Sequence, residues 1–221
     1  MRTLVIGDIH GCLDSLKSLI ESVELKESDL LITLGDYIDR GDNSKGVIDY
    51  LIELKKSHNV ITLKGNHEEL LELACKTRMD RLVWNNVGGL STLVSYGITN
   101  PNHIPKEHWN FLDECEMYYE TDTHIFVHGG LEPDEPVDEQ DAEALLWLRV
   151  RDLKPHMSGK TIVCGHTPQC NHSVLNLSYV ICVDTHVYAE GWLSCLEVET
   201  GTYWQANEKG EVRKKEIANS L

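Results

Sequence analysis

The sequence predicts an α/β fold, and two observations lead to this expectation. First, short apolar runs recur along the 221 residues, each followed at once by turn and polar residues, which is typical of buried strands. Second, helical patterns separate the first three runs, as in parallel βαβ units. The predicted strands are Thr3–Ile6, Leu30–Leu34, Val60–Leu63, Ile125–Val127, Thr161–Cys164 and Val180–Val183.

Three helices are expected between and after the first strands. Apolar residues at positions 13–23 follow the three-and-four spacing of one helical face, and those at 47–54 do the same. Glu68–Leu82 is expected to form the third helix. From Ile125 onward the strands have little helix between them, so we expect a second, more antiparallel sheet.

We expect residues 1–221 to form a single domain, because a chain of this length can bury a full core. Residues 76–115 are less regular than the rest and contain Trp84 and Trp109. We expect this stretch to form an insertion or a wall on the substrate side of the site. Gly88 and Gly89 would permit a bend in it.

The charge balance excludes some partners. Lys and Arg number 20 against 36 Asp and Glu, which gives a net charge of −16. The longest basic run, Arg213-Lys214-Lys215, is expected to be a solvated tail. A nucleic-acid partner is not expected, because phosphate-backbone binding needs a basic face. A membrane partner is not expected either, because no apolar run approaches the ~20 residues of a transmembrane helix.

The cysteines indicate a reducing compartment. The seven are scattered, their number is odd, and none form a CxxC pair, which matches neither a disulfide framework nor a zinc finger. The apolar run at the N-terminus is too short for the core of a signal peptide. We therefore expect a cytoplasmic protein.

Potential metal ligands follow five of the predicted strands. They are Asp8, His10, Asp36, Asn66, His128 and His166. A single Asp or His at a turn usually has a structural role, but random turns would not choose Asp, Asn or His at five strand ends. Mixed oxygen and nitrogen donors suit Mn, Fe or Zn. Six ligands fit two ions that share a carboxylate, for which Asp36, in the middle of the set, is the natural bridge.

The motifs that carry these residues resemble a known family. GDIHG (7–11), GDYIDRG (35–41), GNHE (65–68), VHGG (127–130) and GHT (165–167) occur in this order. The chain resembles the calcineurin-like metallophosphoesterases of the phosphoprotein phosphatase superfamily, in particular the bacterial and lambda-phage-type serine/threonine phosphatases. The resemblance implies a β-sandwich of two mixed sheets flanked by helices, in α/β/β/α layers.

The resemblance also implies roles for individual residues. Asp8, His10 and Asp36 would hold one metal ion, and a second ion would be held by Asp36, Asn66, His128 and His166. His67 would be the general acid, oriented by Asp39. Arg40 would clamp the phosphate, and Arg149 would be the second clamp, with Arg151 as its substitute.

The implied activity is hydrolysis of phosphoserine and phosphothreonine in proteins or peptides, with phosphotyrosine as a further candidate substrate and inorganic phosphate as product. Two divalent cations, Mn²⁺ first and Fe, Zn or Co as alternatives, would bind and activate the hydroxide that attacks phosphorus. The oligomeric state is open, and the chain can fold as a monomer.

Three alternatives remain. The first is a symmetrical dinucleoside tetraphosphate hydrolase of the same fold, a branch that commonly has Ala where this chain has Asp39. The second is a broad phosphoesterase for small molecules. The third is a non-catalytic, metal-stabilised binding module, which predicts the loss of a ligand, of His67 or of an arginine, and none is lost.

Two residues depart from the family pattern. Lys64 precedes GNHE where eukaryotic members usually have Arg, and Lys cannot make the bidentate contact of a guanidinium. The closing motif reads Asp184-Thr185-His186, where the family usually has Gly in the third position. An imidazole there could alter the backbone or touch substrate, since replacement of a Gly matters most at positive φ.

Overall fold

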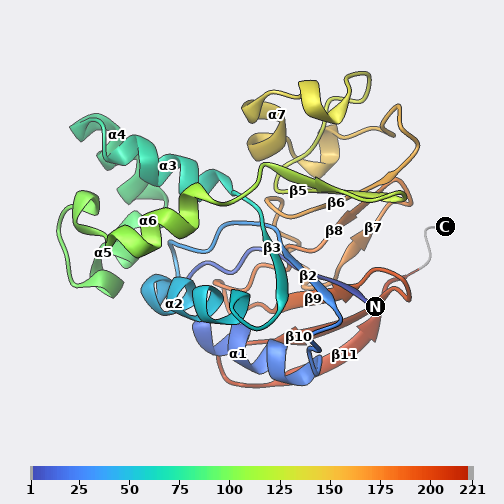
Figure 1. Cartoon of the computed structure of the whole chain (residues 1–221), viewed down its shortest axis with the longest axis horizontal. Helices are drawn as coiled ribbons and strands as arrows, with labels where there is room; N and C mark the ends of the chain where they lie inside the picture. Colours follow the sequence, from blue (N-terminus) through green and yellow to red (C-terminus); the bar gives the residue numbers. More distant parts are fainter. Residues whose placement is uncertain (1, 219–221) are drawn as a thin grey trace.

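The computed structural model describes residues 2–218 and contains two β-sheets packed face to face (Figure 1). The strands of the first sheet, in spatial order, are β11 (Val212–Glu216), β10 (Thr202–Ala206), β9 (Leu193–Glu197), β1 (Thr3–Ile6), β2 (Leu30–Thr33) and β3 (Asn59–Thr62). Those of the second are β4 (Tyr118–Glu120), β5 (His124–Val127), β6 (Thr161–Cys164), β8 (Val180–Cys182) and β7 (Leu175–Asn176).

The first sheet is built around the parallel strands β1, β2 and β3. Thr3 aligns with Leu30, and Leu30 aligns with Asn59. The crossovers run through α1 (Leu13–Ser22) and α2 (Ser44–Lys55). Strand β2 is buried along its whole length, because it lies between these helices and the second sheet. Strand β9 pairs antiparallel with β1, and β10 and β11 extend the sheet from β9 through two further antiparallel pairs.

The second sheet is mixed, and its centre is parallel. Strands β5, β6 and β8 pair in parallel, while β4 and β7 add antiparallel edges. The expectation of a more antiparallel sheet was therefore wrong for its core. Parallel pairing needs long crossover connections, and residues 128–160 and 165–179 provide them with little regular helix.

The expected helix over Glu68–Leu82 is two helices, α3 (Asn66–Ala74) and α4 (Arg78–Trp84). The chain breaks at Thr77, which is extended and whose hydroxyl accepts a hydrogen bond from the Asp80 N–H at 3.1 Å. An N-cap of this kind starts a new helix because it satisfies a free backbone donor. A kinked turn (Asn85–Gly89), in which Gly88 has a non-helical backbone, is followed by α5 (Leu90–Tyr96) and α6 (Lys106–Asp113).

Three apolar clusters define the layers. One lies under α1, α2 and the α3–α6 helices, a second lies between the two sheets, and a third packs α7 (Ala142–Trp147) onto the second sheet. In Figure 1, α1 and α2 lie at the lower left beside the first sheet, and α7 lies above the second. The predicted α/β fold, a sandwich of two mixed sheets flanked by helices, is confirmed.

The basic run near the C-terminus is not a solvated tail. Arg213, Lys214 and Lys215 lie in the edge strand β11, which pairs with β10. The Arg213 guanidinium stacks 3.9 Å above the Trp192 ring, which accounts for its place in the sheet. Within residues 2–218, the structure contains no helix with the length and apolar character to cross a bilayer.

Candidate active site

The six predicted metal ligands lie together between the two sheets. Asp8 and His10 follow β1, Asp36 follows β2, and Asn66 opens α3 after β3. His128 and His166 follow β5 and β6 of the other sheet. All six side chains are buried. The carboxyl ends of parallel strands meet at one edge of a sheet, so the two sheets present these donors to one another.

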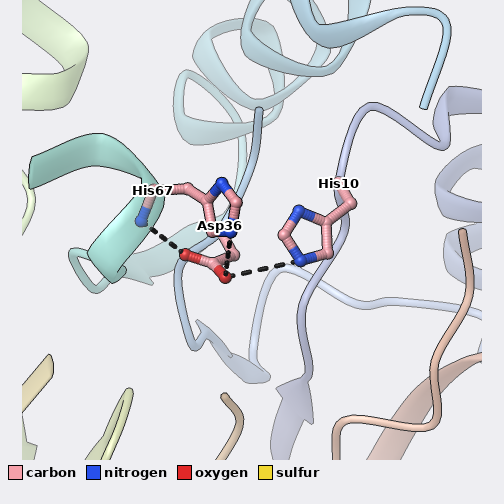
Figure 2. A group of neighbouring side chains, drawn as sticks. All are labelled: His10, Asp36 and His67. Carbon is pink, nitrogen blue, oxygen red and sulfur yellow. Dashed lines mark hydrogen bonds and ion pairs between the residues drawn. The ribbon is translucent and has the colours of Figure 1, made fainter. Parts of the chain in front are cut away.

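Asp36 lies at the centre of this donor set. Its Oδ2 is 3.4 Å from His10 Nε2, and its Oδ1 is 3.5 Å from His128 Nε2. The His67 backbone N–H donates to Oδ1 at 3.0 Å, as Figure 2 shows. Two groups of side chains are close enough to share an ion, His10–Asp36–His67 and Asp8–Asp36–His128, and both contain Asp36. The carboxylate therefore has one oxygen on each side of the set, as a bridging ligand requires.

Backbone carbonyls fix the tautomers of two histidines. His10 Nδ1 is 3.0 Å from the Ile38 carbonyl, and His128 Nδ1 is 2.8 Å from the Leu34 carbonyl. A carbonyl only accepts, so each Nδ1 carries the proton and each Nε2 presents a lone pair to the site. Burial lowers the pKa of His128 and holds that of His10 well below its usual value. Both rings are thus in the neutral form that binds metals.

Asn66 and His166 complete the donor set. Asn66 Oδ1 is 2.9 Å from His128 Nε2 and 3.0 Å from His166 Nδ1. Among the described residues, His166 Nε2 is buried without a hydrogen-bond partner. Burial, and after it the neighbouring His128, lowers the pKa of His166 to about 3. Neutral imidazoles that face an amide oxygen, one with an unpartnered buried nitrogen, fit a bound cation.

The buried carboxylates also require a cation. Burial, followed by the charges of Asp184 and Asp36, raises the pKa of Asp8 well above its usual value. Burial raises the pKa of Asp184 to about 6, and Asp36 adds to the shift. Divalent ions would relieve this repulsion, so the residues fit the two metal ions that the family implies. Sequence reasoning assigned no role to Asp184, although it follows a buried strand as the other acids do.

His67 and Asp39 form a buried pair. His67 Nδ1 is 2.7 Å from Asp39 Oδ2. Burial opposes protonation of His67, but the carboxylates of Asp36 and Asp39 outweigh it and raise the pKa of the ring. The Trp84 indole N–H donates to Asp39 Oδ2 at 2.8 Å, and the Thr92 hydroxyl donates to Oδ1 at 2.7 Å. Sequence reasoning missed these two partners, because they lie 45 and 53 residues along the chain from Asp39.

The two predicted arginine clamps line the same cavity. Arg40 donates to His10 Nε2 at 2.8 Å and is 2.9 Å from His67 Nε2, and its guanidinium lies 4.3 Å over the Tyr188 ring. Arg149 lines the cavity, which has a volume of about 470 Å³. The Arg151 side chain is 80% exposed, pairs with Asp152 and does not line it. The geometry therefore favours Arg149 over Arg151.

Strained backbone is concentrated in the site. Left-handed φ angles occur at five of the residues just described, namely His10, Asp36, Asp39, Arg40 and His166. Non-glycine residues adopt this conformation only when their surroundings enforce it. The buried Glu68 carboxylate accepts three backbone hydrogen bonds at 2.8–2.9 Å, from Asp36, Tyr37 and Gly65. These bonds fix the loop after β2 and explain how it tolerates the strain.

The two departures from the family pattern lie outside this cavity. Lys64, between β3 and α3, forms an ion pair through Nζ with Glu72 of α3 at 2.5 Å and does not line the cavity. His186 has a φ of +65°, which is the conformation expected for the usual Gly. Its N–H donates to Asp184 Oδ1 at 3.0 Å, and its ring packs on Tyr188. The His therefore keeps a glycine-like backbone.

The sandwich and the donor set have the arrangement expected of a metal-dependent phosphoesterase. The sequence profile described as calcineurin-like phosphoesterase matches residues 1–188, and the chain belongs to this family.

Similar proteins are consistent with this class. The chain is 26% identical over 135 residues to the symmetrical bis(5'-nucleosyl)-tetraphosphatase of Haemophilus ducreyi, covering 61% of this chain and 47% of that protein. For the same enzyme of Actinobacillus succinogenes the identity is 30% over 142 residues, covering 61% and 46%. The chain thus spans about half the length of these curated relatives. A crystal structure assigned provisionally to a diadenosine tetraphosphatase aligns with a TM-score of 0.67, 24% identity and coverage of 99% and 94%.

Proposed function

We propose that the protein is a metal-dependent hydrolase that splits dinucleoside tetraphosphates symmetrically. The observation that carries this proposal is a cavity that His67, Arg40 and Arg149 line together with three of the proposed metal ligands, Asp36, Asn66 and His166. His67 in turn is paired with Asp39 through Nδ1. The substrate class rests on the curated relatives, which are named for this reaction. They do not support a protein substrate, so the expected phosphoprotein activity becomes the second candidate, favoured by the presence of Asp39.

The proposed ligands divide into two sets that share Asp36. Asp8, His10 and Asp36 would hold one divalent ion, Mn²⁺ as the first choice. Asn66, His128 and His166 would hold the other together with Asp36. When bound, two such ions supply Lewis-acid stabilisation of the phosphoryl charge and activation of the attacking water.

The remaining residues bind the phosphates and move one proton. Arg40 and Arg149 present planar guanidinium groups to non-bridging phosphoryl oxygens. His67, held by Asp39 through Nδ1, is oriented to donate its Nε2 proton to the leaving oxygen. One water is consumed, the central P–O bond breaks, and two nucleoside diphosphates leave. The cytoplasmic location expected from the cysteines, all of which are free, belongs to this proposal.

The test compares diadenosine tetraphosphate with a phosphoserine peptide, using metal-stripped protein with Mn²⁺ added back. We expect two ADP molecules per tetraphosphate and a higher kcat/KM than for the peptide. His67→Asn should reduce peptide turnover by about 10²–10⁴-fold, since an alkoxide needs a proton to leave. It should reduce tetraphosphate cleavage less, because a diphosphate is a better leaving group. Preferential cleavage of the peptide would overturn the proposed substrate class while leaving the phosphoesterase assignment in place.

A further inference from the structure

The cavity at the candidate active site is lined by both polar and apolar side chains. The polar ones include Arg40 and Arg149, His67, and three of the proposed metal ligands, Asp36, Asn66 and His166. The apolar ones include Leu70, Val83, Val87 and Trp147. Val83 and Val87 come from the α4–α5 segment, and Trp147 ends α7 beyond the other sheet. These apolar side chains therefore share the cavity with the proposed phosphate-binding groups and come from two separate parts of the fold.

Trp147 is held in place although it is partly exposed. Its indole N–H donates to Glu69 Oε2 on α3 at 2.8 Å, which joins α7 to the opposite wall. The edge of its ring packs on His166, with centroids 5.9 Å apart and an interplanar angle of 80°. The ring nevertheless remains 38% exposed, and Val83 is 48% exposed. An aromatic ring that is fixed before substrate arrives loses little entropy when a flat group stacks on it.

We propose that Trp147, with Val83 and Val87, binds the nucleobase of the nucleoside diphosphate half that lies nearest the catalytic residues. This inference rests on the proposed function and names the part of the substrate that these side chains recognise. A nucleobase offers an apolar, flat face, and stacking on an indole tolerates any base. The cavity volume of about 470 Å³ is within the range of small-ligand sites. Residues 76–115 thus act as a substrate-side wall.

The experiment measures binding of ADP and of inorganic phosphate to Mn²⁺-loaded protein by calorimetry. Trp147→Ala should weaken the affinity for ADP by about tenfold, since the stacking partner is lost. It should change the affinity for inorganic phosphate by less than twofold. Trp147→Phe should restore most of the ADP affinity, because it keeps an aromatic face. Val94→Ala is the control for the exposed apolar surface: Val94 is 78% exposed in α5, on the α4–α5 segment that carries Val83 and Val87, and does not line the cavity. This substitution should leave the affinities for ADP and for inorganic phosphate unchanged.

Kinetics with diadenosine tetraphosphate provide the second readout. Trp147→Ala should raise KM with little change in kcat. Equal losses for ADP and phosphate would overturn the inference, since Trp147 would then only support the site. An unchanged ADP affinity of Trp147→Ala would also overturn it. So would a Trp147→Ala protein that binds a phosphotyrosine peptide more weakly but binds ADP as before. If ADP binding depends on Trp147 but the tetraphosphate is not cleaved, the base site stands and the proposed function fails.

Discussion

At the scale of single residues, Asp39 depends on partners from distant parts of the chain. Its two carboxylate oxygens accept hydrogen bonds from Trp84 and Thr92 while one of them also binds His67. Burial raises the pKa of Asp39, while the hydrogen bonds from His67, Thr92 and Trp84 oppose this effect. Asp39, which orients the candidate general acid His67, is thus itself held in place by Trp84 of α4 and Thr92 of α5.

Replacement of Trp84 by Phe tests this dependence. The change keeps an aromatic ring but removes the N–H donor, and a hydrogen bond to a charged group contributes about 1.5–3 kcal/mol. We expect kcat to fall by about tenfold or more with KM nearly constant, because His67 loses its orientation. Trp109→Phe, in α6 and half-buried, is the matched control. Equal effects of the two substitutions on kcat would show that Trp84 acts only through packing.

At the scale of elements, the turn between α4 and α5 is joined to the loop that carries Arg40. The Arg40 N–H donates to the Gly88 carbonyl at 3.3 Å. Gly88 has a φ of +129°, and a Cβ placed on it would lie 2.8 Å from the Arg40 nitrogen. The bend expected at Gly88 and Gly89 is therefore present, and Gly88 lies directly against Arg40, the proposed phosphate clamp.

Gly88→Ala should disturb both stability and phosphate binding. The added methyl meets backbone and requires a strained φ, so we expect a loss of about 1–3 kcal/mol in unfolding free energy. Arg40 should shift with it, which weakens inorganic phosphate binding several-fold. Gly97→Ala is the control, because Gly97 also has positive φ but nothing lies within 4 Å of its Cβ position. That variant should lose some stability and keep phosphate affinity; a parallel loss of phosphate affinity would contradict the argument.

At the scale of the whole molecule, one ion pair remote from the site links stability to pH. Arg2 binds Asp29 through Nε at 3.2 Å and Nη2 at 2.5 Å, and the Asp29 side chain is only 3% exposed. The hydrogen bond from Arg2 lowers the pKa of Asp29 to about 2. Its folded pKa is below the ordinary value of about 3.9, so its stabilisation is present above pH 4 and is lost as pH falls towards 2.

Asp29→Asn should therefore destabilise the protein in a pH-dependent way. We expect the unfolding free energy of metal-free protein to fall by about 1–2 kcal/mol at pH 6, and the difference from wild type to shrink between pH 4 and pH 2. Urea unfolding at several pH values measures this. Lys56→Met removes an exposed pair with Glu53 and should have no measurable effect. A difference for Asp29→Asn that stays constant with pH would rule out the linkage.

The elements that could be predicted from sequence are those whose signal is local. The six expected strands correspond to β1, β2, β3, β5, β6 and β8, because each is a buried run that ends in turn residues. Strand β11 was missed, since its exposed and half-exposed residues alternate and only pairing with β10 makes it a strand. The break between α3 and α4 was missed, because the cap at Thr77 interrupts a helical pattern that looks continuous in the sequence.

The residues of the candidate site likewise fall into those that could be predicted from the sequence and those that could not. Residues within the short motifs, such as His67 and Asp39, could be singled out because those motifs resemble the family's. Trp84 and Thr92 could not be, because their contact with Asp39 exists only after the helical segment folds over the loop. The parallel centre of the second sheet likewise depends on which strands pair, and that is settled by packing rather than by any run of residues.

The division of the proposed metal ligands between the two sheets has a consequence for folding order. The His166 backbone N–H donates a hydrogen bond to the Asp8 carboxylate, and the two residues are 158 positions apart in the chain. A contact of this sequence separation is costly to close early, and an unfolded chain offers no preformed cation site. The set Asp36, Asn66, His128 and His166 is complete only once both sheets have closed on each other. A cation bound to that set would therefore not nucleate the fold; its binding free energy would instead hold the two halves of the finished sandwich together.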